Sequence, residues 1–208
     1  GKGLPKWKPA NYSEEFYGLT TMRTGIEKSR NLMTIRLANK IGVDNILSLA
    51  KKLDLDDNLE KNMSMSLGTG LVSLIDITNA YGIIANNGKK IKPNFIKSIY
   101  TKNGKKIIDN SNKACENCIL NKIFETNKLP NITNNVSQVI DPRLAFQITS
   151  MMEGVVKRGT AKSLRELDIP LAGKTGTTND NKDAWFIGFS PDIVIGVYVG
   201  YDNPKSLG

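Results

Sequence analysis

A lysine, a glycine and two hydroxyl side chains lie together in the segment Lys174-Thr175-Gly176-Thr177. On a strand edge, these groups can bind a carboxylate and lie beside an acyl-transfer centre. The chain contains no histidine, so a Ser-His-Asp triad is excluded. Any serine-type acyl transfer by this protein must therefore use lysine to handle the proton.

A second polar segment, Ser29-Arg30-Asn31, falls between two predicted helices at residues 19–28 and 32–41. A hydroxyl and an amide two residues apart on such a turn can both point into a cleft. The alternative is that Ser29 or Asn31 only caps the second helix, by binding its free N–H groups. Capping and catalysis are compatible, so both interpretations remain open.

Lys174 also has two less specific interpretations. Gly173-Lys174-Thr175 matches the end of a Walker A phosphate loop, but that motif needs a glycine where this chain has Asp168. The motif also needs a helix after the lysine, whereas this sequence predicts a turn and a second strand, so we reject nucleotide binding. The other interpretation is a surface lysine on an edge strand, because a Lys-Thr-Gly tripeptide can arise by chance.

The composition indicates one globular domain with a basic, well-solvated surface. The chain has 208 residues, 39% of them hydrophobic, and a net charge of +9. The lysines are dispersed, without an arginine-rich stripe or aromatic platform, which makes a nucleic-acid partner a weak alternative. No apolar run approaches the length of a membrane span, and no signal peptide opens the chain. Residues 1–9 are typical of a loop, and we expect the chain to begin in the middle of a larger protein.

The two cysteines, Cys115 and Cys118, form one Cys-x-x-Cys pair. Zinc would need a second pair or histidines, and the chain has neither; no residue pattern indicates another metal or a cofactor. The flanking Asn- and Lys-rich sequence does not offer the βαβ setting of a thioredoxin-like site. A small structural disulfide in an oxidising compartment and two free thiols are both compatible with the spacing.

Periodicity and turn signals predict mainly helices in the first half of the chain. Gly42 is expected to end the helix over 32–41, and Asp44 to cap the next helix. Residues 54–70 are predicted to be irregular. The apolar stretch over about 72–86 predicts a helix that is buried on most sides.

The second half of the chain combines a hairpin, a long helix and three strands. Asn103-Gly104 predicts the hairpin, and residues 109–139 are predicted to be a mobile loop or insertion. A helix is expected from Asp141-Pro142 to Gly159, with an inner face of Leu144, Ile148, Met151, Met152 and Val155. Short turns predict antiparallel strands, the last of them with both faces covered, at 171–178, 183–190 and 193–201.

Ser-x-Asn and Lys-Thr-Gly belong to a motif set that, with Ser-x-x-Lys, is typical of β-lactamases and penicillin-binding proteins. On these residues the chain resembles the transpeptidase domain of class A penicillin-binding proteins, the bifunctional cell-wall synthases. The resemblance runs nearly end to end and keeps one order of segments, at 7–12, 67–69, 152–156, 159–161, 172–178, 183–189 and 196–202.

The resemblance implies an α+β fold of the penicillin-binding/β-lactamase-like type, with a five-stranded antiparallel sheet flanked by helices. Residues 1–208 would form part of such a transpeptidase domain, truncated at its N-terminal side and supplying the last three strands. The family's first two strands would be missing, which would leave an exposed sheet edge. A second copy of the chain could pair with that edge to form a homo-oligomer.

The family's nucleophile is the serine of a Ser-x-x-Lys helix start, placed well before the Ser-x-Asn turn. The one literal match, Ser48-Leu49-Ala50-Lys51, follows that turn, and its serine and lysine are expected on a solvated helix face. We interpret this match as coincidence. The nucleophile and its lysine are therefore expected upstream of this chain, and the isolated chain is expected to be inactive.

The resemblance implies D,D-transpeptidation. A serine attacks a D-Ala-D-Ala stem peptide of peptidoglycan, D-alanine leaves, and an amine on a neighbouring stem peptide accepts the acyl group. β-Lactams would trap the same serine. Ser29 would join a proton relay with Lys174 and the missing lysine, Asn31 would hydrogen-bond that lysine and the substrate amide, and protonated Lys174 would attract the substrate carboxylate.

The resemblance also assigns substrate binding to the rest of the lysine strand. Thr175 and Thr177 would supply hydroxyls, and the Thr177 backbone N–H would be one of two oxyanion donors. Gly176 would let the substrate backbone approach the strand. For these roles the Arg30 turn and the Lys174 strand must face each other across a shared groove.

The family implies a location in the bacterial cell envelope, on the extracytoplasmic side of the inner membrane, with contact to the membrane only through segments outside this chain. Two alternatives share the motifs. One is a D,D-carboxypeptidase or β-lactamase-like enzyme, and the other is a sensor or scaffold module that keeps the fold without turnover.

Overall fold

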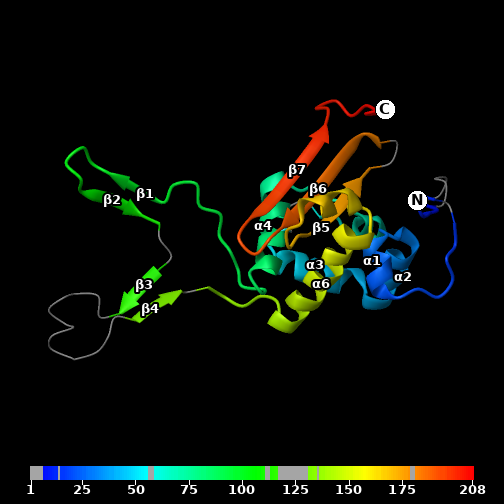
Figure 1. The fold of residues 1–208 in the computed structure, drawn as a ribbon, viewed down its shortest axis with the longest axis horizontal. Helices are drawn as coiled ribbons and strands as arrows, with labels where there is room; N and C mark the ends of the chain where they lie inside the picture. Colours follow the sequence, from blue (N-terminus) through cyan, green and yellow to red (C-terminus); the bar gives the residue numbers. More distant parts are fainter. Residues whose placement is uncertain are drawn as a thin grey trace.

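The structure is a computed structural model that describes residues 7–13, 15–55, 59–110, 113–116, 131–134, 136–178 and 181–208, with only the backbone for 113–116 and 131–134. Helices α1 to α4 and α6 gather beside a three-stranded antiparallel sheet, and two smaller two-stranded sheets lie off to one side (Figure 1). The predicted α+β class is confirmed. Within the described residues, none of the helices is both long and apolar enough to cross a membrane.

The first three helices follow local signals, with one exception. Helix α1 (Met22–Glu27) begins at Thr21, and α2 (Asn31–Ile41) ends at Gly42, as predicted. Helix α3 (Val43–Lys52) also begins at Gly42, so the prediction that Asp44 caps it is wrong. Gly42 has φ 89°, and this left-handed backbone lets one residue end α2 and start α3. Asp44 lies in the first turn and pairs with Lys61 at 2.6 Å.

The stretch predicted to be irregular holds a short 3₁₀ helix, η1 (Met63–Leu67), capped by Asn62, whose Oδ1 accepts the Met65 N–H at 2.9 Å. Helix α4 (Leu74–Ala85) follows, with Ser73 as its cap. Its Ala80 and Ile83 are buried, but Leu74 and Ile75 are exposed. Beyond its first turn the helix packs against two apolar clusters, with Ala80 and Ile83 in one and Tyr81, Ile84 and Ala85 against the other. The prediction that it is buried on most sides is therefore confirmed except at its exposed start.

A side arm leaves the body after α4. Strands β1 (Ser98–Tyr100) and β2 (Lys106–Asp109) form the predicted antiparallel hairpin. Strands β3 (Lys113–Glu116) and β4 (Asn131–Asn134) form a second pair, inside the segment predicted to be a mobile insertion. Mobility of 109–139 stays a prediction. The question of a disulfide lies outside the described residues, because the side chain of Cys115 and all of Cys118 are not described.

Helix α6 (Pro142–Arg158) is the central element of the body. Asp141 caps it through the Arg143 N–H at 2.9 Å, and Gly159 ends it, both as predicted. Met152 and Val155 face the core as expected. Leu144 does not: it is 57% exposed, because the neighbouring Ala145 takes the inward position with no exposed surface.

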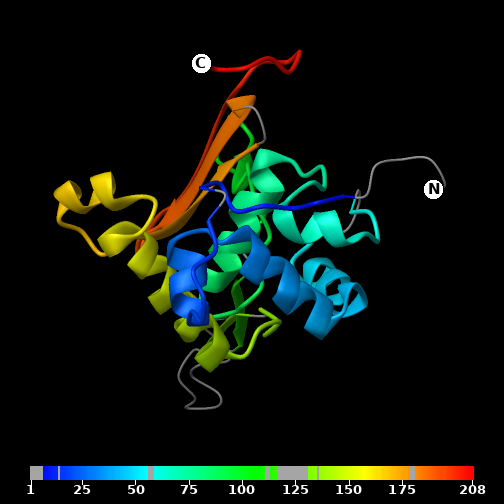
Figure 2. The same ribbon diagram turned by 90° about the vertical axis from the view of Figure 1, so that its right-hand side faces the viewer.

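The main sheet has the order β5–β6–β7, formed by Ala172–Thr177, Asp183–Phe189 and Val194–Gly200, which confirms the three predicted antiparallel strands. Lys174 pairs with Ile187, which pairs with Gly196, so these three residues share the face against α4 and α6. Figure 2 shows the sheet edge-on, with α4 beside one face and η2 (Lys162–Leu167) on the other side.

The last strand is less covered than predicted. Ile193, Ile195, Val197 and Val199 are 44–60% exposed, so the prediction that both faces of β7 are covered is wrong. Among the described strands, β7 pairs only with β6, and its other edge is open. This agrees with the expected exposed edge; pairing with a second copy stays a prediction.

Candidate active site

The Ser29 turn is built by the C-terminal cap of α1. The N–H of Ser29 donates to the Ile26 carbonyl at 3.1 Å, and the N–H of Arg30 donates to the Gly25 carbonyl at 2.8 Å. These two bonds define a Schellman motif, in which the residue at the position of Ser29 adopts a left-handed backbone and is most often glycine. Ser29 has φ 53°. The chain therefore keeps a hydroxyl where the backbone favours glycine.

Ser29 and Lys174 are in direct contact although they lie 145 residues apart in the sequence. The Lys174 Nζ donates to Ser29 Oγ at 2.8 Å and to the Thr175 carbonyl at 2.8 Å. The first contact joins the turn after α1 to strand β5 and confirms that the two predicted elements meet. The interpretation of Lys174 as a plain surface lysine is therefore wrong, because its ammonium is bound by the Ser29 hydroxyl of the turn and by the Thr175 carbonyl of the strand.

Burial lowers the pKa of the Lys174 ammonium from 10.5 to about 8. Removal from water disfavours the charged form of a lysine. None of the ion pairs among the described residues includes Lys174, so no carboxylate compensates for that burial. At pH 7 the group is still mostly protonated, and it presents an unpaired positive charge suited to an anion.

The capping alternative for Ser29 and Asn31 is wrong. Helix α2 begins after Arg30 without a side-chain cap from its own segment. Asn11 supplies the cap from a distance: its Oδ1 accepts the Leu32 N–H at 3.2 Å, and its Nδ2 donates to the Glu15 carbonyl at 2.8 Å. The Asn31 Nδ2 in turn donates to the Ala10 carbonyl at 3.0 Å. The segment before α1 thus fixes the start of α2, and no local signal indicated this role of Asn11.

Arg30, between the two polar residues of the turn, takes a different direction. Its guanidinium stacks on the Tyr17 ring, 3.1 Å from the centroid. It lines a cavity of about 490 Å³ whose other residues are Asn11, Phe16, Tyr17, Gly18, Leu19, Thr20, Leu32, Met33 and Arg36. Neither Ser29 nor Lys174 lines this cavity, so it is not the expected shared groove. The turn and the strand meet through the direct hydrogen bond between those two residues.

The remaining residues of the lysine strand lie on its outer end. Thr175 pairs with Phe186 and faces away from Lys174, and its Oγ1 lies 2.7 Å from Thr160 Oγ1. Thr177 is exposed at the end of β5. A Cβ at Gly176 would approach the Trp185 side chain to 3.2 Å, so packing alone already favours a glycine there. The substrate-binding roles expected for Thr175, Gly176 and Thr177 stay predictions.

The Ser48-x-x-Lys51 match does not contribute to this site. Both side chains are exposed on α3. Neither has a hydrogen bond to the Ser29 turn or to Lys174 among the described contacts. The structure confirms that this pair lies on a solvated helix face.

Comparison with known proteins decides the family. The family described as the penicillin-binding protein transpeptidase domain matches residues 1–208. The chain belongs to this family. Penicillin-binding protein 1A of Rickettsia bellii is 48% identical over the whole chain, and that of Neisseria meningitidis is 35% identical over 97% of it. The chain spans about a quarter of these relatives, 26% and 23% of their lengths.

Solved structures give the same fold. Penicillin-binding protein 1A from Haemophilus influenzae superposes on the transpeptidase chain with a TM-score of 0.82 at 25% identity, covering 100% of this chain and 34% of that one. PonA1 from Mycobacterium tuberculosis, in complex with penicillin V, gives a TM-score of 0.71 at 22% identity, covering 94% and 52%. The resemblance seen in the sequence is confirmed, and the penicillin-binding transpeptidase fold is shown.

Proposed function

We propose that this chain supplies the Ser-x-Asn and Lys-Thr-Gly parts of a D,D-transpeptidase site that cross-links peptidoglycan stem peptides. The observation that supports this most is the 2.8 Å contact between Lys174 Nζ and Ser29 Oγ, made by an ammonium without a carboxylate partner among the described ion pairs. A free terminal carboxylate, as in D-Ala-D-Ala or the acid of a β-lactam, is the anion that this charge can bind.

The reaction that fits this arrangement is acyl transfer through an ester. A serine from outside this chain would attack the penultimate D-Ala carbonyl, forming an ester as the peptide bond to the terminal D-alanine breaks. The amine of a second stem peptide would then attack the ester, forming the new amide and releasing the serine. Ser29 would pass a proton towards the leaving amine, and Lys174 would hold the hydroxyl oriented and the carboxylate bound.

Substrate would bind along the outer end of β5. The Thr177 hydroxyl would bind the terminal carboxylate, and its backbone N–H would donate to the carbonyl oxygen that becomes negative. One such donor typically stabilises the transition state by about 3 kcal/mol. Asn31 would bind the substrate amide through its Oδ1, because its Nδ2 is committed to Ala10. The reaction would take place on the extracytoplasmic side of the inner membrane, where peptidoglycan is assembled.

Covalent labelling tests this function. In the full-length protein that carries this chain, a fluorescent penicillin should form a stoichiometric adduct, observed by intact mass. The 208-residue chain alone, shown to be folded by circular dichroism, should form none, because its Ser48 and Lys51 are exposed and the described hydrogen bonds of Lys174 go to Ser29 and Thr175 instead. Absence of an adduct on the full-length protein would refute the function, and an adduct on the isolated chain would refute the missing nucleophile.

The pH dependence of labelling follows from the pKa of Lys174. With a pKa of about 8, the ammonium loses its proton as the pH rises through 8, and the carboxylate of the β-lactam loses its attraction. We expect the second-order rate constant for acylation to be near its maximum at pH 7 and to fall about tenfold for each pH unit above 8, relative to a Lys174→Arg variant that stays charged. A rate that stays constant to pH 10 would contradict a protonated Lys174.

A further inference from the structure

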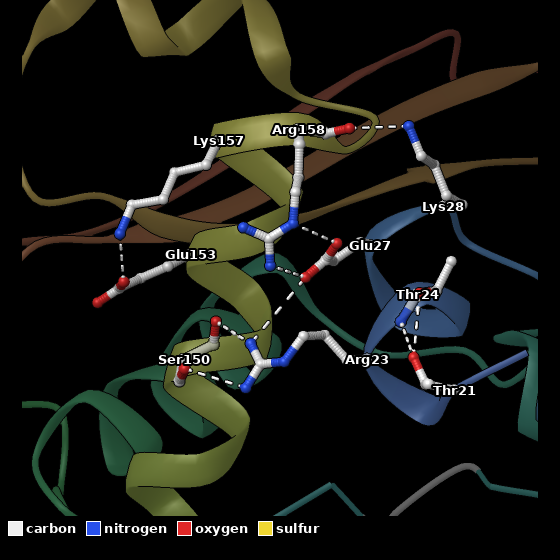
Figure 3. A network of polar contacts seen from close by, with 9 residues as sticks. All are labelled: Thr21, Arg23, Thr24, Glu27, Lys28, Ser150, Glu153, Lys157 and Arg158. Carbon is white, nitrogen blue, oxygen red and sulfur yellow. Dashed lines mark hydrogen bonds and ion pairs between the residues drawn. The ribbon is translucent and has the colours of Figure 1, made fainter.

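Two side chains of α1 and one from its C-terminal cap, Lys28, bind α6 immediately before Ser29 (Figure 3). Arg23 donates to the Ser150 carbonyl at 2.9 Å, and Lys28 donates to the Arg158 carbonyl at 2.8 Å. Between them, the Glu27 carboxylate binds the Arg158 guanidinium through two hydrogen bonds, one of them at 2.9 Å. These contacts join helices that are more than a hundred residues apart in the sequence.

Glu27 is an unusual residue in this position, because its side chain is only 5% exposed. A buried carboxylate destabilises the fold unless it is paired and hydrogen-bonded, and an apolar pair of similar volume is often at least as stable. Stability alone therefore does not explain a glutamate here. A bidentate pair does fix the direction and distance of its partners more closely than apolar packing does.

Helix α6 and its C-terminal cap have space for Glu27 because Gly154 in the helix and Gly159 at the cap lack a side chain. A Cβ at Gly154 would lie 2.1 Å from the Glu27 Oε1, and a Cβ at Gly159 would lie 2.3 Å from the Glu27 carbonyl oxygen. A side chain at Gly154 would displace the Glu27 carboxylate, and one at Gly159 would collide with the Glu27 backbone. Both ends of Glu27, the carboxylate and the carbonyl, are thus seated against the last turns of α6.

From Glu27 the contacts run to the lysine strand and back. The Glu27 carbonyl accepts the Thr160 N–H at 3.1 Å, and the Thr160 hydroxyl lies 2.7 Å from that of Thr175. Lys174, which precedes Thr175 on β5, donates to Ser29, two residues after Glu27. This closed circuit makes the separation of Ser29 Oγ and Lys174 Nζ depend on how Glu27 is held.

We propose that Glu27 and Arg158 are positioning residues for the acyl-transfer site, which hold the Ser29 hydroxyl at bonding distance from the Lys174 ammonium. This role rests on the proposed transpeptidase function. Neither residue touches Lys174: the groups bound to its ammonium are the Ser29 hydroxyl and the Thr175 carbonyl, and the described ion pairs place no charged side chain on it. The pair acts through the turn and the strand.

The test replaces both members of the bidentate pair. Arg23, which lies 4.0 Å from the Glu27 carboxylate, is 41% exposed and keeps its hydrogen bonds to Ser150. Glu27→Met/Arg158→Met in the full-length protein keeps the volume and removes the directed bonds, and Glu153→Gln is the matched control, since it breaks an exposed pair with Lys157 on the same helix. We measure the thermal transition and the pH profile of acylation by a fluorescent penicillin. The double variant should keep the transition within a few degrees and lose about 10- to 100-fold in acylation rate, the effect of an ångström-scale misplacement.

The pH profile separates positioning from a purely structural role. If the turn moves from Lys174, water reaches the ammonium, and the alkaline fall in acylation should move above pH 8 in the double variant but not in Glu153→Gln. A double variant with the unaltered rate and profile would overturn the proposal. So would a loss of rate that only follows a loss of the folded fraction. No acylation of the unaltered protein would overturn the proposed function itself, and this role with it.

Discussion

Replacing Lys174 with methionine in the full-length protein should reduce acylation by a β-lactam about 10²- to 10³-fold, the usual effect of removing a preorganised electrostatic group. The ammonium is the one cation bound to Ser29 in the described contacts, at 2.8 Å, and it has no carboxylate partner. Methionine has a similar length and fills the same space, so the change removes the charge and leaves the packing. The measurement is the second-order rate constant with a fluorescent penicillin at pH 7.

The same substitution should stabilise the protein, which rules out unfolding as the cause of the lost activity. Burial lowers the pKa of Lys174 to about 8 in the folded state, whereas the unfolded chain keeps a value near 10.5. Between about pH 8 and pH 10.5 the unfolded chain keeps the lysine proton that the folded protein loses, so the stability of the unaltered protein rises with pH in that range. At pH 7 the penalty, on the order of 3 kcal/mol, is present in full, and methionine removes it together with the two hydrogen bonds of the ammonium, so a net gain smaller than this is expected.

The stability difference between the methionine variant and the unaltered protein should therefore shrink as the pH rises from 8 to 10. Lys157→Met is the control, because Lys157 is exposed and lies on α6 in a surface pair with Glu153. It should change neither acylation nor the thermal transition by more than the small effect expected for surface pairs. A Lys174→Met variant that acylates at the unaltered rate would show that the ammonium is not part of the site.

Local signals predicted most of the fold, and failed where two signals competed. Helix α6 begins at Asp141 and ends at Gly159 as expected, because capping depends on a few adjacent residues. Asp44 is a good capping residue, but helix α3 already begins at Gly42, two residues earlier, because the left-handed backbone of Gly42 starts it. At Leu144 the apolar side chain is exposed because Ala145 lies nearest the core. Adjacent apolar residues on a helix give similar periodicity, and the sequence cannot choose between them.

The candidate site depended on contacts that periodicity does not carry. The meeting of Ser29 and Lys174 followed from the resemblance to a family, not from spacing along 145 residues. Asn11 caps α2 from outside that helix, and a polar residue in a loop gives no sign of its distant partner. Glu27 was missed because glutamate is almost never buried. The two glycines that make room for it, Gly154 in α6 and Gly159 at the helix cap, were the available signal.

Replacing Ser29 with glycine and with alanine should reduce acylation equally but affect stability differently. Both changes remove the hydroxyl that Lys174 binds, and both should reduce acylation about 100-fold or more, as loss of a proton-transfer group does. Ser29 has φ 53°, a conformation that costs a residue with a Cβ about 1–2 kcal/mol and costs glycine little. The glycine variant should therefore be more stable than the alanine variant by about 1 kcal/mol.

The chain contains a matched control for this comparison at the end of α4. The N–H of Asn87 donates to the Ile84 carbonyl and that of Gly88 to the Ile83 carbonyl, so Asn87 occupies the same place in a Schellman motif, with φ 55°. Glycine at position 87 should again be more stable than alanine by about 1 kcal/mol, with acylation unchanged in both variants. Thermal and chemical unfolding of the four full-length variants measure the two differences.

The two sites together show whether function fixes the residue at position 29. Asparagine tolerates the left-handed backbone and is a common substitute for glycine there, so Asn87 needs no functional explanation. Serine has no such preference, and its hydroxyl is the group that Lys174 holds. If Ser29→Gly both gains stability over Ser29→Ala and still acylates, the hydroxyl is dispensable and the strained serine is unexplained. If Ser29→Gly is more stable than Ser29→Ala but no longer acylates, the strained backbone at position 29 is retained for the hydroxyl that Lys174 binds.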